Sequence, residues 1–120
     1  MAKYCNTFKK GTLDMLFLKL LSEKDLYGYE ICSIIPQLSN NSIAINAGNM
    51  YPSLYKLEEK GFITSYEKTV GKRAKRVYYK ITDAGKKELR EMMEDYRCIV
   101  EANEAILSYK FEQGENEKNS

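Results

Sequence analysis

Four cations stand within five residues in the segment Lys72-Arg73-Ala74-Lys75-Arg76. Guanidinium and ammonium groups in such a cluster bind phosphate, whose contacts supply the sequence-independent part of the affinity of proteins for DNA. Runs rich in β-branched and aromatic residues flank the cluster, Phe62 to Glu67 before it and Val77 to Ile81 after it. Such runs are typical of strands, so we expect the basic segment to form the tip of a hairpin.

A second polar group precedes this hairpin, on a segment with helical spacing. Met50, Leu54 and Leu57 recur on one side of that helix, and Asn49, Ser53 and Lys56 fall on the other side. Asn49 and Ser53 carry short polar groups able to reach base edges or phosphates, and Lys56 lies a turn further along for a backbone contact. Tyr51 on the same helix either donates its hydroxyl to a phosphate or packs as an aromatic side chain.

The order of elements that must position these groups is that of a winged helix. A helix ends at Gly61, two strands follow around the basic loop, and a new helix starts with Thr82 as its N-cap. The predicted fold class is α+β, mostly α: a winged helix-turn-helix with a long C-terminal dimerisation helix. At 120 residues the chain fits one domain. We expect residues 1–81 to form the DNA-binding part, residues 82–111 to add the C-terminal helix to the same compact unit, and residues 112–120 to be a disordered tail.

The first two helices supply the rest of the core, and between them and the third helix we expect a short loop. In the first, the core stripe is predicted to be Leu13, Leu16, Phe17, Leu20 and Leu21, with Met15 and Leu18 off it. The second helix runs from about Tyr27, and Pro36 kinks or ends it because proline lacks an amide donor. Its core residues are predicted to be Ile31, Ile34, Ile35 and Leu38. Ile43 to Ile45 is predicted to be a short strand. Asn46 and Asn49 both suit the N-cap of the third helix, and Pro52, which fits best in a first turn, favours Asn49.

The last helix carries an apolar stripe for which a winged-helix core leaves no partner. The stripe follows spacings of three and four, and its predicted dimerisation residues are Leu89, Met92, Tyr96, Val100, Asn103, Ile106 and Leu107. Burial against a second copy of the chain is the simplest expectation, and folding back on the first helix is the alternative.

Composition and charge narrow the class of function. Residues 1–81 hold 13 Lys and Arg against 7 Asp and Glu, a net charge of +6, and residues 82–120 hold 6 against 10, a net charge of −4. A basic first part suits nucleic acid. The chain has no histidine and no phosphate-binding glycine loop, so we expect neither an enzyme nor a cofactor. The three cysteines lack the spacing of a metal site, and no run is long and apolar enough for a membrane span, so we expect a cytoplasmic protein.

Four short motifs in order resemble the PadR family of bacterial transcriptional regulators. They are Tyr27-Gly28-Tyr29-Glu30-Ile31, Tyr51-Pro52-Ser53-Leu54, Leu57-Glu58 with Gly61, and Arg76-Val77-Tyr78-Tyr79-Lys80-Ile81-Thr82 with Gly85. The similarity extends roughly from Gly11 to Leu107, with Asn49-Met50 where Thr-Leu is usual. The resemblance implies a homodimer that binds double-stranded DNA.

Roles for further residues follow from their places in this fold. Lys72, Arg73 and Lys75 at the hairpin tip are expected along or in the minor groove. Arg76 matches the family arginine and either contacts DNA or pairs with a carboxylate such as Glu58. Tyr27 and Tyr29 open the second helix, where the positive end of the helix favours phosphate and Gly28 permits close approach.

An effector site at the dimer interface is a further expectation. Its tentative residues are Met15, Leu18, Met92, Met93, Tyr96 and Ile99, whose thioethers and aromatic ring suit a planar aromatic molecule. Short-tailed PadR regulators of multidrug efflux are similar here, and Tyr96 stands where they commonly carry tryptophan. Plain packing of the interface explains the same residues.

Two classes of function thus remain. The first is a ligand-responsive dimeric repressor that binds an inverted repeat with half-sites about one helical turn apart. The second is a winged helix that binds another protein or scaffolds an assembly. The cationic hairpin tip and the polar side of the third helix favour DNA, because a protein-binding surface more often exposes apolar residues.

Overall fold

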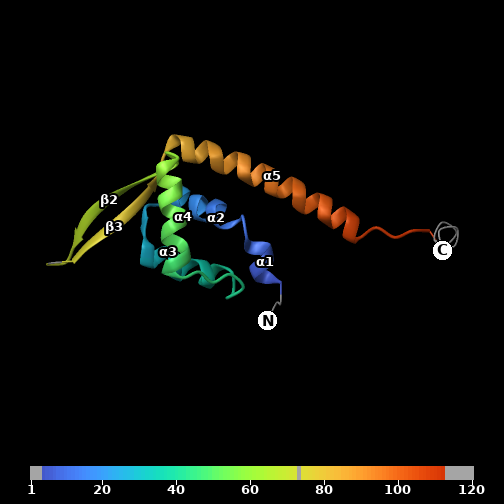
Figure 1. Cartoon of the computed structure of the whole chain (residues 1–120), viewed down its shortest axis with the longest axis horizontal. Helices are drawn as coiled ribbons and strands as arrows, with labels where there is room; N and C mark the ends of the chain where they lie inside the picture. Colours follow the sequence, from blue (N-terminus) through green and yellow to red (C-terminus); the bar gives the residue numbers. More distant parts are fainter. Residues whose placement is uncertain (1–3, 73, 113–120) are drawn as a thin grey trace. The chain divides into compact units, whose positions relative to one another are not determined.

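The structure, a computed structural model, describes residues 4–72 and 74–112, apart from the side chain of Asn6. The elements in chain order are α1 (Cys5–Lys9), α2 (Leu13–Glu23), β1 (Leu26–Tyr27), α3 (Gly28–Leu38), α4 (Ala47–Glu59), β2 (Ile63–Val70), β3 (Ala74–Ile81) and α5 (Asp83–Leu107). Figure 1 labels all of them except the short β1. The predicted α+β fold with a small antiparallel sheet and a long C-terminal helix is confirmed. Arg73 and residues 113–120 of the predicted tail lie outside the described residues.

The sheet has the order β1-β3-β2, and both pairings are antiparallel. Ile63 pairs with Ile81, and both side chains are buried, so this end of the hairpin closes the core. Strand β1 pairs with the free edge of β3. The prediction of a strand at residues 43–45 is wrong. The amide and the carbonyl of Ile43 are both hydrogen bonded to the Ser39 hydroxyl, which holds this segment in a local turn instead.

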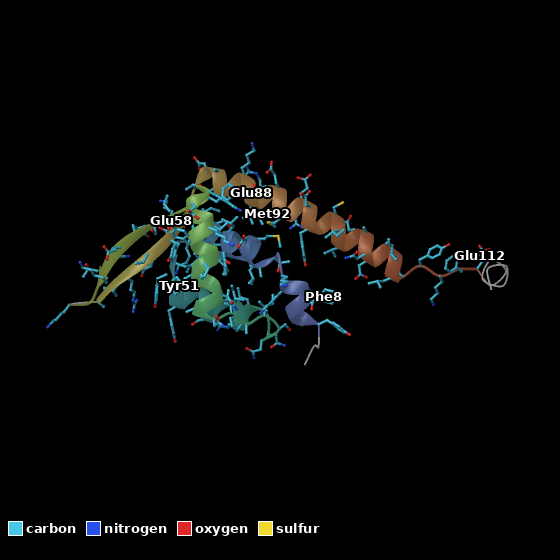
Figure 2. The ribbon with its side chains drawn as sticks, viewed as in Figure 1. Phe8, Tyr51, Glu58, Glu88, Met92 and Glu112 are labelled. Atoms are coloured by element: carbon cyan, nitrogen blue, oxygen red, sulfur yellow. The ribbon has the colours of Figure 1, made fainter. Side chains whose placement is uncertain are left out.

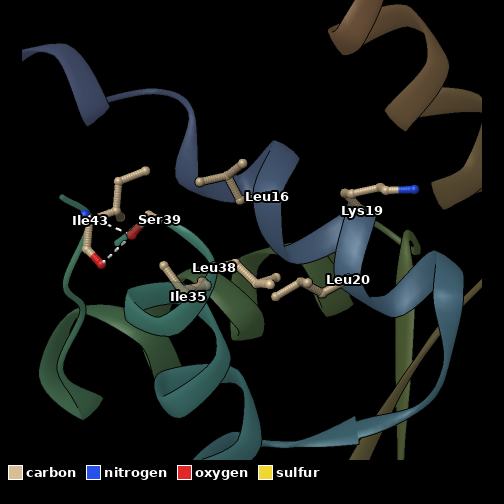
Figure 3. Close-up of a pocket in the computed structure, with 7 residues that line it drawn as sticks. All are labelled: Leu16, Lys19, Leu20, Ile35, Leu38, Ser39 and Ile43. Atoms are coloured by element: carbon tan, nitrogen blue, oxygen red, sulfur yellow. Dashed lines mark hydrogen bonds between the residues drawn. The ribbon is translucent and has the colours of Figure 1, made fainter. Parts of the chain in front are cut away.

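Helix α2 buries a different stripe from the predicted one. Met15 and Leu18 are buried together with Phe17 and Leu21, because α2 contacts both β3 and α4 and so needs a broad apolar arc. The prediction that Met15 and Leu18 lie off the core is therefore wrong. Leu16 is only half-buried and belongs to a surface groove of about 240 Å³, shown in Figure 3, whose lining residues are Leu16, Lys19, Leu20, Ile35, Leu38, Ser39 and Ile43.

Helix α3 continues through Pro36 and ends two residues later, at Leu38. Leu38 is 73% exposed, so its predicted place in the core is wrong. Asn40 and Asn41 adopt positive φ angles just beyond the helix, a conformation in which asparagine is several-fold enriched. Leu38 is the last residue of α3, one turn beyond the buried Ile35, and it lies where the core has ended.

Helix α4 begins earlier than the position of Pro52 favours. The Asn46 side chain accepts a hydrogen bond from the Asn49 amide at 2.9 Å, so Asn46 is the N-cap and Asn49 lies in the first turn. Pro52 is consequently inside the helix. The Asn49 amide is satisfied at the cap.

Thr82 caps α5, as predicted from the sequence. Its hydroxyl accepts a hydrogen bond from the Gly85 amide at 3.0 Å and donates to the Gly61 carbonyl at 2.7 Å. Leu89, two turns into the helix, is buried, so it belongs to the monomer core and not to a dimer surface as predicted. By internal contacts the chain divides after Arg90 into two units, and the helix ends at Leu107, before the predicted residue 111.

Candidate nucleic-acid interface

The exposed face of α4 is the first part of the candidate interface. Met50, Leu54 and Leu57 are buried on the core side, and Asn49 and Lys56 are exposed on the flank. Ser53 is half-buried, because its helical position lies next to the buried stripe. The outward side of α4 also carries Tyr55, which is 63% exposed and was not among the predicted site residues. The signal for it was available in the sequence, since a helical wheel centred on the three core residues places position 55 on the outward half of the helix.

Tyr51 links α4 to the start of α3. Figure 2 labels Tyr51 near the amino-terminal end of α4, and the side chain is about half exposed. A Cβ added at Gly28 would lie 2.9 Å from the Tyr51 ring carbon Cζ. The space beside Gly28 that we expected to admit a phosphate is therefore occupied by the Tyr51 ring in this structure. The Tyr51 hydroxyl also lies at this spot, so the side chain packs against Gly28, and its contact with a phosphate stays a prediction.

At the amino-terminal end of α3, a carboxylate already accepts a hydrogen bond from one backbone amide. The Tyr27 amide donates a hydrogen bond to Glu30 Oε1 at 3.2 Å. Tyr29 is exposed, and its ring stacks on that of Tyr27 with a centroid distance of 6.5 Å. Of the two tyrosines, Tyr29 is thus the one whose ring is free to meet a partner.

The hairpin of β2 and β3 forms the wing. The two strands run side by side to a common tip in Figure 1, and Lys72 and Lys75 near the tip are exposed. The guanidinium carbon of Arg76 lies 4.4 Å from the centroid of the Tyr27 ring. The proposed pairing of Arg76 with Glu58 is absent from the described residues, where Glu58 instead accepts a hydrogen bond from Ser65 at 2.7 Å.

Glu58 also contributes to the pKa of Tyr79, a buried tyrosine of β3. The pKa of Tyr79 is raised from its ordinary value, mainly because the side chain is buried, and the charges of Tyr51 and Glu58 add to this effect. Tyr79 therefore remains a neutral core residue. Its surroundings place it in the packing between sheet and helices.

The second unit presents apolar side chains along α5. Tyr96, Ile99 and Val100 are exposed, as are Ile106 at 74% and Leu107 at 78%. The polar residue of the predicted stripe, Asn103, is exposed too, and Met92 and Met93 are half-buried. In the part of the chain that the structure describes, no helix is long and apolar enough to cross a membrane.

A search for related proteins decides the family. Residues 17–91 match the model of the Transcriptional regulator PadR-like family. The chain belongs to this family. The resemblance seen in the sequence is thereby confirmed, and the family consists of transcriptional regulators and not of enzymes.

Individual proteins extend this match. An uncharacterized protein of Lysinibacillus sphaericus is 39% identical over 92 residues, which are 77% of this chain and 84% of that protein. A transcriptional regulator from Clostridium thermocellum has a similar structure, with a TM-score of 0.76 and 30% identity over 82% of this chain and 96% of that chain.

The Negative transcriptional regulator PadR of Bacillus subtilis is 32% identical over 89 residues, which are 74% of this chain and 49% of that protein. Its structure in complex with operator DNA matches with a TM-score of 0.64 and 32% identity, over 68% of this chain and 46% of that chain. This chain therefore spans about half the length of the Bacillus subtilis protein.

Proposed function

We propose that this protein is a DNA-binding transcriptional regulator that represses its target as a homodimer on an inverted repeat in the cytoplasm. The observation that carries the proposal is the combination of the PadR-like match with an exposed α4 face beside a cationic wing. The Bacillus subtilis relative is named a negative regulator, and its structure contains operator DNA. Both facts belong to that relative and support the same role here.

In the proposed complex, α4 enters the major groove with its exposed face toward the bases. Asn49 and Tyr55 point toward base edges or sugars, Lys56 and Tyr51 toward phosphates, and the wing follows the neighbouring backbone. A protein-binding winged helix is the alternative class. The cluster of wing cations favours DNA, because cations that bind phosphates release counterions from the DNA and so increase the affinity.

The homodimer follows from the apolar face of α5. A helix whose exposed side carries Tyr96, Ile99, Ile106 and Leu107 has more apolar surface than a solvated helix tolerates. We propose that a second copy covers this face, which holds two α4 helices at a fixed spacing. Sedimentation of an Ile99→Asp variant tests this step: we expect a monomer, with the dimer kept by a Glu101→Asp control, and a dimeric Ile99→Asp protein would contradict it.

Ligand response is proposed only for the α5 part of the predicted site, since Met15 and Leu18 are core residues. Met92 and Met93 are half-buried beside the exposed ring of Tyr96, a combination suited to a planar aromatic molecule. Titration of planar cationic dyes into the parent and a Tyr96→Ala variant tests it. We expect dye binding and DNA release by the parent alone, and equal binding by both proteins removes Tyr96 from the site.

The main experiment measures the dependence of DNA affinity on salt. The duplex is taken from the region upstream of the coding sequence and is searched for an inverted repeat. Each phosphate contact contributes roughly 0.9 to the slope of log affinity against log salt, so replacing Lys72, Arg73 and Lys75 by alanine should lower the slope by about 2 to 3. The control replaces Lys86, Lys87 and Arg90 on α5, which removes the same charge from exposed positions. Equal slopes for the two triple variants would mean that the wing makes no phosphate contact.

A further inference from the structure

Three tyrosines stand in one row across the sheet. Tyr78 on the central strand β3 pairs with Tyr27 on β1 and with Tyr66 on β2. Residues paired across antiparallel strands project from the same face, so the three rings lie side by side. Their centroids are 5.4 Å apart for Tyr27 and Tyr78 and 5.7 Å apart for Tyr66 and Tyr78. We call these three residues the tyrosine row.

A hydrogen bond joins the tyrosine row to a residue beside β1, on the other side of the central strand. The hydroxyl of Tyr66 on β2 donates to Asp25 Oδ2 at 2.6 Å, and Asp25 directly precedes Leu26 of β1. The bond thus joins the two edges of the sheet across β3. It accounts for an aspartate at a surface where a direct role in binding phosphate would be electrostatically unfavourable.

Two cations of the next row toward the wing tip rest on these rings. Lys68 and Arg76 are paired directly opposite each other, an arrangement in which like charges repel. Each cation lies over a different ring: Lys68 Nζ is 5.4 Å from the centroid of Tyr78, and the Arg76 guanidinium carbon is 4.4 Å from that of Tyr27. The attraction of cations to aromatic faces therefore sets where both side chains lie.

We propose that Tyr27 and Tyr78, held in place by Tyr66 and Asp25, are positioning residues that hold Arg76 and Lys68 ready for the DNA backbone. The inference rests on the proposed function and adds a mechanism to it. A guanidinium that rests on a ring keeps the N–H donors at its edge free for phosphate. Side chains held in place before binding lose less entropy when they bind, so the row raises affinity without touching DNA.

The first experiment uses the free protein and removes one atom. Tyr66→Phe deletes the hydroxyl and keeps the ring, and Tyr109→Phe is the matched control at another exposed tyrosine. We expect the ring-current shifts of the Arg76 and Lys68 side-chain protons to fall toward random-coil values in Tyr66→Phe and in Asp25→Ala, and to be unchanged in Tyr109→Phe. Unchanged shifts in both row variants would overturn the positioning device.

The second experiment measures DNA binding in two backgrounds. In the parent background, Tyr66→Phe should raise Kd about two- to tenfold for each side chain freed, with the same salt slope because no phosphate contact is lost. Arg76→Ala should instead lower the slope by about 1. In a Lys68→Ala, Arg76→Ala background, Tyr66→Phe should have no further effect, because its partners are gone.

The outcomes separate this inference from the function on which it rests. Equal losses from Tyr66→Phe in the two backgrounds mean that Tyr66 contacts DNA itself, which overturns the positioning role and leaves the function intact. Failure of the parent to bind any duplex overturns the proposed function. It also overturns the role of the tyrosine row in DNA binding.

Discussion

Replacing Gly85 by alanine tests how the first turn of α5 packs within the first unit. A Cβ at this position would meet the Phe62 carbonyl oxygen and would lie 2.7 Å from Ile81 Cγ1. Neither neighbour can give way easily. The Phe62 carbonyl accepts the Thr82 amide at 3.0 Å, and Ile81 is buried.

The expected loss of stability can be estimated from these contacts. Overpacking of a filled core costs typically 1 to 3 kcal/mol, and weakening of the Thr82 hydrogen bond adds about 1 kcal/mol. The better helix propensity of alanine offsets up to about 1 kcal/mol. We therefore expect Gly85→Ala to destabilise the protein by about 1 to 3 kcal/mol, or by roughly 5 to 20 °C in Tm for a unit of this size.

The measurement is urea and thermal unfolding followed by circular dichroism at one fixed protein concentration, because association also changes apparent stability. The control is Ala84→Gly at the exposed neighbouring position, which isolates the propensity difference and should cost about 0.5 to 1 kcal/mol. A Gly85→Ala protein as stable as the parent would refute the close packing of α5 against residue 62.

Three further predictions concern single side chains. Asn46→Ala should destabilise the protein by about 0.5 to 2 kcal/mol in urea unfolding, because the cap of α4 is lost, whereas Asn46→Asp should retain most of the stability. Leu38→Ser should change the free energy of unfolding by less than about 0.5 kcal/mol, because the side chain is exposed, and a larger loss would show that it is covered in solution. The pKa of Tyr66 is raised from its ordinary value of 10.0, first by its hydrogen bond to Asp25, so that bond stabilises the fold below pH 10 and is lost as the pH rises through the folded pKa. Titration of tyrosinate absorbance should show Tyr66 ionising at lower pH in Asp25→Asn than in the parent.

The sequence predicted the four longer helices and the β2–β3 hairpin in their order, because periodicity and turn residues act locally. The strands around the basic loop, the Thr82 cap and the split of α4 into buried and exposed sides all follow from neighbours within a few residues. The PadR-like motifs are short segments of this kind. They were therefore readable without knowledge of the packing.

The errors arose where distant segments decide the outcome. Met15 and Leu18 are buried because α2 packs on both α4 and β3, and a single helical stripe does not reveal two partners. Strand β1 was not predicted, because a two-residue strand at Leu26 has no periodicity to detect. The tyrosine row was also not predicted, because the register between strands, which brings Tyr27, Tyr66 and Tyr78 together, is not written in any one segment.

Photocrosslinking from α4 tests the central claim most directly. A photoreactive p-benzoylphenylalanine replaces Tyr55 on α4 in one protein and Tyr109 beyond α5 in another, two tyrosines that are 63% and 60% exposed. Each protein is irradiated with a duplex that the parent selects from a random-sequence library. The proposed function predicts a strong protein–DNA crosslink from position 55 and little or none from position 109. Failure of the parent to select a duplex, or crosslinking from position 109 equal to that from position 55, would contradict it.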